Sequence, residues 1–140
     1  MHFTIDANGP IPIYEQVTEQ ICGAIASGVI RPGESIPSVR ELARTLAINP
    51  NTAARVCREL QSNSIVSLSR GVGLIVTDEA PDRCLRRRVA LFENRAAALI
   101  NEGLRIQLDL ETIERIIHRQ IAERRTLQNN TLSSAQRGKR

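Results

Sequence analysis

The spacing of hydrophobic positions predicts a helix soon after a short N-terminal arm. Apolar residues three or four positions apart predict that this helix runs to about Ser27, with Gly28 as its C-terminal stop. They are Tyr14, Val17, Ile21 and Ile25. Pro32 and Gly33 then force a turn, and a very short strand is expected at residues 35–36.

Two short helices follow, and each has its own start signal. Ser38 and Glu41 form an S-x-x-E capping box, in which two side chains satisfy backbone N–H groups that a helix start leaves unpaired. Asn49 and Pro50 mark the next start, since asparagine is a favoured N-cap and proline is tolerated at the first helical position. The predicted buried positions are Val39, Leu42, Ala43 and Leu46 in the first of these helices, and Ala53, Val56, Cys57 and Leu60 in the second.

A hairpin is predicted next. Residues 65–69 and 74–77 alternate as strands do, and residues 70–73 contain the turn glycines Gly71 and Gly73. Strands this short are not stable alone, so we expect them to pack on the first helix. Two helices joined by a tight turn and followed by a hairpin are the layout of a winged helix-turn-helix.

The C-terminal half predicts two further helices. Pro81 within residues 78–82 indicates a domain junction, and Glu102 with Gly103 is expected to end the helix that follows it. That helix carries a heptad-like stripe, namely Leu85, Val89, Phe92, Ala96 and Leu99. The last helix is predicted from Asp109, with Leu108 and Ile113 as a hydrophobic staple. Its apolar face contains Leu110, Ile113, Ile117 and Ile121.

The expected fold class is therefore mainly α with a small β-wing. Residues 1–78 form the winged helix-turn-helix domain and residues 82–125 a helical dimerisation module. From Thr126 the chain is polar and ends in basic residues, so residues 126–140 are predicted to be a disordered basic tail.

Charge and aromatic content narrow the choice of partner. The formal net charge is +4, but the first eighty residues hold six arginines against eight acidic residues, so DNA affinity depends on where individual arginines lie. The candidates there are Arg40, Arg44, Arg55, Arg58 and Arg70. The sequence has two Phe, one Tyr and no Trp. Single-strand binding usually depends on bases stacking on aromatic side chains, so we do not expect it here.

Several function classes find no support in the sequence. Cys22, Cys57 and Cys84 are far apart and do not cluster with His2 or His118, so we expect buried thiols and no metal site, with a redox-sensing thiol as the alternative. No signal peptide and no membrane span are evident, which predicts a cytoplasmic protein. No cofactor motif or nucleophile–base signature is present, so we do not expect an enzyme.

Six segments, in order and at matching spacing, carry a family resemblance. They are PIYEQ (12–16), IASG (25–28), RPGE (31–34), PSVRELA (37–43), NPNT (49–52) and RGVG (70–73). From Pro12 to Thr77 the chain resembles the DNA-binding domain of the GntR family of bacterial transcriptional regulators. The short two-helix remainder resembles the YtrA-type subfamily, whose members carry a small helical dimerisation module.

The resemblance implies a homodimer on a palindromic operator, usually acting as a repressor. It also implies the DNA-contacting positions Ser38, Arg40, Asn49, Asn51, Thr52, Arg55, Arg70 and Gly71. Their chemistry suits this role, because an asparagine amide pairs with adenine and an arginine fork pairs with guanine or phosphate. The plainer readings are a polar helix start for Asn51, a solvated helix arginine for Arg40 and an ordinary turn at Arg70.

Dimerisation is expected through the two C-terminal apolar stripes, at Leu85, Val89, Phe92, Ala96, Leu99, Ile113, Ile117 and Ile121. The basic cluster Arg83, Arg86, Arg87 and Arg88 either flanks this seam in solvent or contacts phosphate. The alternative function is an adaptor whose C-terminal helices bind another protein. Two helices give little lining for a ligand pocket, so any small-molecule effector is expected at the dimer interface or between the domains, where it changes the angle between the winged domains.

Overall fold

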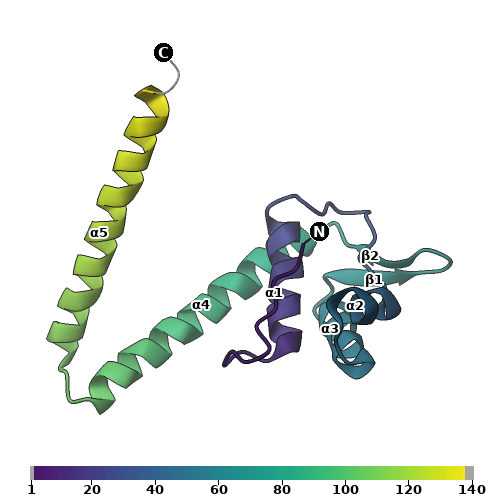
Figure 1. Ribbon diagram of the computed structural model, residues 1–140, viewed down its shortest axis with the longest axis horizontal. Helices are drawn as coiled ribbons and strands as arrows, with labels where there is room; N and C mark the ends of the chain where they lie inside the picture. Colours follow the sequence, from purple (N-terminus) through teal and green to yellow (C-terminus); the bar gives the residue numbers. More distant parts are fainter. Residues whose placement is uncertain (1, 138–140) are drawn as a thin grey trace. The chain divides into compact units, whose positions relative to one another are not determined.

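The structure of the protein, a computed structural model, describes residues 2–137 and the side chains of residues 2–133. Five helices and a two-stranded sheet follow one another along this described part of the chain (Figure 1). They are α1 (Ile13–Ala26), α2 (Val39–Leu46), α3 (Pro50–Ser62), β1 (Val66–Ser69), β2 (Gly73–Val76), α4 (Ala80–Arg105) and α5 (Leu110–Arg137). The predicted fold class, mainly α with a small β-wing, is confirmed. The chain divides into two compact units, one up to Phe92 and one from Glu93 onward.

The N-terminal unit is built around one aliphatic core. α1 and α2 both pack against α3, and their apolar stripes meet there. The buried members include Val17, Ile21 and Ile25 of α1, Leu42 of α2, and Ala53, Val56 and Leu60 of α3. The stripe that predicted each helix is therefore also the face that it buries.

Both predicted helix starts are confirmed. The Ser38 hydroxyl accepts a hydrogen bond from the Glu41 N–H, and the Ser38 N–H donates to the Glu41 carboxylate. Asn49 caps α3 and Pro50 is its first residue. Between the two helices Ala47 adopts a left-handed conformation, with φ of 50°, which ends α2 abruptly.

The hairpin pairs β1 with β2 in antiparallel register, from Val66 opposite Val76 to Ser69 opposite Gly73. Where a very short strand was expected at residues 35–36, the structure has an isolated bridge from Ser35 to Ile75 and no third strand. The strands were expected to pack on the first helix. In the structure, β1 lies against α3. The Ile65 N–H donates to the Leu60 carbonyl at the end of α3, and this bond brings the strand to that helix.

Helix α4 begins inside the N-terminal unit. Its first residue, Ala80, and Cys84 one turn later are both fully buried in the winged domain's core. Pro81 lies in the first helical turn, where its missing N–H has no helical partner to lose. The division between the two compact units falls within α4, after Phe92.

The turn between α4 and α5 differs from the prediction at Gly103. This glycine does not end α4, which continues to Arg105. A Cβ at Gly103 would lie 2.8 Å from Cδ1 of Ile113, so a larger residue here would force the Ile113 side chain to shift. Asp109 caps α5, as its carboxylate accepts a hydrogen bond from the Thr112 N–H at 2.7 Å.

The predicted disordered tail is helical over most of its length, because α5 continues through Arg137. The hydroxyls of Thr126 and Thr131 donate to carbonyls four residues back, as they do in a regular helix. Residues 138–140 lie outside the described residues.

Three further observations concern predicted absences and the thiols. Cys22, Cys57 and Cys84 are all buried, as expected of small apolar side chains. Over the described residues, no group of three or more His, Cys, Asp or Glu side chains is placed to hold a metal ion. None of the helices in this part of the chain is long and apolar enough to cross a membrane.

Candidate nucleic-acid interface

Helix α3 has one face in the core and one in solvent. Ala53, Val56 and Leu60 are fully buried, whereas Asn51 and Arg55 are exposed on the first two turns. Thirteen residues give a helix about 20 Å long, which suits a major groove about 12 Å wide. α1 and α2 pack on the buried side and leave the exposed side open.

The two asparagines at the start of α3 have different tasks. The Asn49 side-chain oxygen accepts a hydrogen bond from the Asn51 N–H at 2.8 Å, so this oxygen is committed to the cap. Asn49 therefore retains only its amide N–H groups for a partner. Asn51 is exposed, and its amide is free to offer both a donor and an acceptor, the combination that adenine requires. Thr52 beside it is half-buried.

At the start of α2, Ser38 is held on both sides by Glu41. The hydrogen bond from the Ser38 backbone N–H, at 2.8 Å, keeps the pKa of Glu41 below its ordinary value, and the bond with the Ser38 hydroxyl adds to this effect. The hydroxyl oxygen is thus an acceptor within the protein, and both polar groups of Ser38 are engaged by Glu41. Arg40, two positions into the helix, is exposed.

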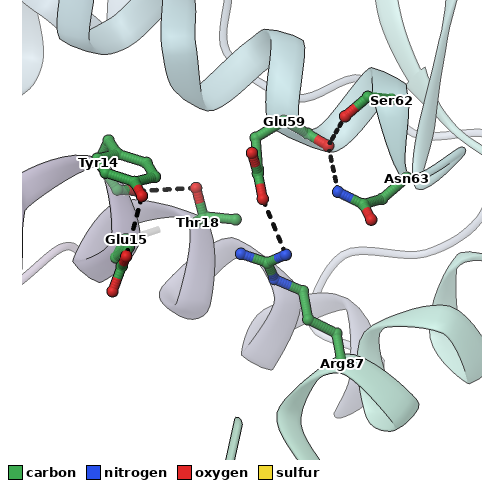
Figure 2. Close-up of polar contacts among 7 residues, drawn as sticks. All are labelled: Tyr14, Glu15, Thr18, Glu59, Ser62, Asn63 and Arg87. Carbon is green, nitrogen blue, oxygen red and sulfur yellow. Dashed lines mark hydrogen bonds and ion pairs between the residues drawn. The ribbon is translucent and has the colours of Figure 1, made fainter. Parts of the chain in front are cut away.

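Arg55 has a neighbour that the sequence did not reveal. Its guanidinium carbon lies 3.6 Å from the centre of the Tyr14 ring, in a cation–π contact between α3 and α1. The Tyr14 hydroxyl donates to the Glu15 carboxylate at 2.9 Å (Figure 2), and this bond raises the pKa of the tyrosine. One feature of the sequence could have indicated this contact: Tyr14 is the only tyrosine in the sequence and stands within an otherwise aliphatic stripe.

The hairpin tip carries the remaining candidates. Arg70 and Gly71 are both exposed, and Figure 1 shows the loop between β1 and β2 extending beyond α2 and α3. Gly71 has a φ of +76°, which L-residues with a side chain adopt at a cost. The tip therefore holds an arginine on a turn whose shape depends on glycine.

The eight predicted dimerisation residues fall into two groups. Most are exposed or half-exposed, including Phe92, with 72% of its surface accessible, and Leu99, with 59%. Ile113 differs, because it is 7% accessible and fills the space beside Gly103. The exposed or half-exposed members are Leu85, Val89, Phe92, Ala96, Leu99, Ile117 and Ile121.

Within the C-terminal unit, a shallow hollow of about 360 Å³ lies against the α5 stripe. It is lined by Ile100, Leu110, Ile113, Glu114, Ile117, His118 and Ile121. An exposed hollow lined mainly by isoleucine and leucine is typical of a surface that another apolar surface covers.

Comparison with known proteins agrees with this geometry. Residues 13–76 match the family model described as "Bacterial regulatory proteins, gntR family". The HTH-type transcriptional repressor YtrA of Bacillus subtilis is 30% identical over 109 residues, a match that covers 78% of this chain and 84% of that protein.

Solved structures extend the match beyond the winged domain. A GntR family transcriptional regulator from Listeria monocytogenes superposes with a TM-score of 0.64 at 28% identity, covering 82% of this chain and 98% of that one. The GntR-family transcription factor YtrA from Sulfolobus acidocaldarius gives a TM-score of 0.52 at 27% identity and covers 86% and 97% of the two chains. This chain therefore belongs to the GntR family of transcriptional regulators, and two of the relatives that match most of its length are named YtrA.

Proposed function

We propose that the protein binds a palindromic DNA operator as a homodimer and represses transcription there. The observation that carries this proposal is the exposed start of α3, where Asn51 and Arg55 face solvent while the opposite face is locked into the core. Ser38, Arg40, Asn49, Thr52, Arg70 and Gly71 are the further residues proposed to contact DNA. The YtrA protein of Bacillus subtilis, which is named a repressor, supports the direction of regulation.

The free energy needed for specific binding favours two DNA-binding domains per complex. A good bidentate contact discriminates between bases by about 1–3 kcal/mol. Specific DNA binding is typically tighter than non-specific binding by about 4–10 kcal/mol, which one small domain with a few base contacts does not reach. A dimer with twofold symmetry doubles the contacts and requires a symmetric operator.

The C-terminal helices supply the dimer surface in this proposal. Leu85, Val89, Phe92 and Leu99 expose much of their apolar area on α4, and Ile121 does so on α5. Within the C-terminal unit, a second copy that covers Ile121 would also cover the hollow beside Ile117, because Ile121 lines it. A small-molecule effector would either compete with the second copy for this hollow or bind in the pocket that the two copies form over it. The volume of the hollow is at the lower end for ligand pockets.

The test is selection from a pool of randomised duplexes with the purified full-length protein, followed by light scattering of the free protein. We expect the selected sequences to be palindromic and the free protein to be a dimer. A monomer that enriches no sequence would overturn the proposal and favour the adaptor function.

Two alanine variants locate the contacts. Arg40→Ala and Asn51→Ala should each weaken binding to the selected duplex by about 1–3 kcal/mol and leave thermal unfolding unchanged, since both side chains are exposed. Asn94→Ala removes an exposed asparagine from α4 and is the matched control, expected to bind as the wild type does. Equal affinity of Asn51→Ala and Asn94→Ala would remove Asn51 from the interface.

A further inference from the structure

An ion pair joins α3 to α4 within the N-terminal unit. Nη1 of Arg87 lies 3.0 Å from Oε1 of Glu59 (Figure 2), although the two residues are 28 positions apart. Both side chains are largely covered, with 26% and 33% of their surfaces accessible. Arg87 thus lies on the covered side of α4, and it bonds to the helix that carries Asn51 and Arg55.

The backbone at the Glu59 end of this pair is held firmly. The Glu59 carbonyl accepts hydrogen bonds from the Ser62 hydroxyl at 3.0 Å and from the Asn63 side-chain amide at 2.7 Å (Figure 2). These bonds close the last turn of α3. Glu59 is therefore a fixed point on a rigid helix whose other end faces DNA in the proposed function.

The Arg87 end continues a row of anchors along α4. Ala80 and Cys84 are fully buried, and Arg87 follows at helical spacing on the same side. On the next turns, Val89 and Phe92 are exposed. The pair therefore lies near the point where α4 leaves the core of the winged domain.

The pair is poorly optimised for stability alone. Nε of Arg87 is buried, and no hydrogen-bond partner for it is present among the described residues. Burying charges is costly, and an apolar pair of similar size often stabilises a protein equally well or better. The pair is only partly covered, and its directional bond between two helices can fix their orientation even where it adds little stability.

We propose that the Glu59–Arg87 pair is a positioning pair that fixes the direction of α4 relative to α3 and thereby sets the half-site spacing of the operator. The inference rests on the proposed dimeric DNA binding. One base pair of spacing shifts a half-site by about 3.4 Å and turns it by about 35°. A well-fixed α4 accepts one spacing, whereas a loosely held α4 accepts several.

The experiment uses the palindrome that the full-length wild-type protein selects from randomised DNA, with its centre lengthened or shortened by one and two base pairs. Affinities for this series and for a single half-site are measured for the wild type, Glu59→Gln and Glu79→Gln. Glu79→Gln is the matched control, because it removes the same charge from an exposed pair in which Glu79, just before α4, bonds to Arg83 in the first turns of α4 and not to α3.

We expect the wild type and Glu79→Gln to prefer one spacing by about tenfold or more over its neighbours, and Glu59→Gln to prefer it by less than about threefold. The half-site affinity of Glu59→Gln should stay within about twofold of the wild type. An unchanged spacing profile in Glu59→Gln, or an equal loss in Glu79→Gln, would overturn the positioning role. A wild type that selects no palindrome would instead overturn the proposed function.

A second variant covers the case in which Glu59→Gln leaves Arg87 unpaired and the domain unfolds. The double variant Glu59→Met with Arg87→Leu replaces the pair by apolar side chains and keeps the helices packed. It should unfold at the wild-type temperature or above it and still accept several spacings. A stable double variant with the wild-type spacing profile would contradict the proposal.

Discussion

The two units of this chain use the same aliphatic residues in opposite ways. The N-terminal unit buries its stripes against one another, so Ile21, Leu42 and Leu60 are almost completely inaccessible. In the C-terminal unit Leu99 and Ile121 remain half-exposed or more, and Ile113 is the residue buried among those described there. One unit contains its own core, whereas the other leaves apolar surface exposed that, in the proposed dimer, a second chain would cover.

This difference teaches that helical periodicity alone does not show what covers an apolar stripe. α1 and α4 both carry hydrophobic residues at helical spacing. The stripe of α1 meets α3 because tight turns and a hairpin bring several elements around it. In the described part of the chain beyond Phe92, the elements are the remainder of α4 and α5, and two helices leave much of their apolar surface in water.

The largest effect is expected from the self-contained core. Leu60→Ala should cost about 2–5 kcal/mol of unfolding free energy, because it opens a cavity in a fully buried site of α3. Urea unfolding measures this cost, which should not depend on protein concentration. A strong concentration dependence would show that the N-terminal unit also relies on a partner.

The next effect concerns the exposed stripe. Leu99→Asp should weaken the dimer by at least about 30-fold per copy, since it buries an unpaired charge in the proposed interface, and should leave the winged domain folded. Ala97→Asp places the same charge at an exposed position off the stripe of α4 and serves as the control. Sedimentation equilibrium compares the two, and equal dissociation constants would remove Leu99 from the interface.

A smaller effect is expected from the pH dependence of the capping box at the start of α2. The hydrogen bond from the Ser38 N–H lowers the pKa of Glu41, so the ionised carboxylate stabilises the fold above its unfolded pKa. This contribution is lost as the pH falls through the lowered native value. Thermal unfolding at pH 7 and at about pH 3 should show a smaller acid-induced loss for Glu41→Gln than for the wild type. Glu93→Gln, a change on the exposed surface of α4, should behave as the wild type does.

The smallest effect concerns backbone strain. Ser64 has a φ of +55° after the end of α3, a conformation that costs a residue with a side chain more than it costs glycine. Ser64→Gly should therefore stabilise the N-terminal unit by up to about 1 kcal/mol, even though glycine gains more entropy on unfolding. A fall in the melting temperature would show that the serine makes a compensating interaction.

Features that depend on neighbouring residues in the sequence were predicted well. The capping box at Ser38 and Glu41 and the cap at Asn49 are local arrangements, so the sequence contains all that determines them. The prediction of a disordered tail is wrong for residues 126–137, because a polar composition alone does not prevent a helix. Residues 126–137 contain neither proline nor glycine, and nothing in them interrupts α5.

Features that depend on distant residues were missed. The role of Gly103 is decided by Ile113 of the next helix, and the orientation of Arg55 by Tyr14, which lies 41 positions earlier. The Glu59–Arg87 pair likewise joins two helices, α3 and α4, whose contact no sequence pattern indicates. Identifying the candidate DNA-facing residues needed only the motif, but identifying what holds them needed the packing of α1, α3 and α4.

The hairpin tip has a consequence for protein chemistry. Apart from Gly71 and its two chain neighbours, no atom of the described residues lies within 4 Å of the place where an L-residue's Cβ would stand. The positive φ, and not a lack of space, is therefore what favours glycine here. A semisynthetic protein with D-alanine at this position would keep the turn, whereas L-alanine would distort it. The wing could thus be stiffened by mirror-image chemistry without changing the surface that Arg70 presents.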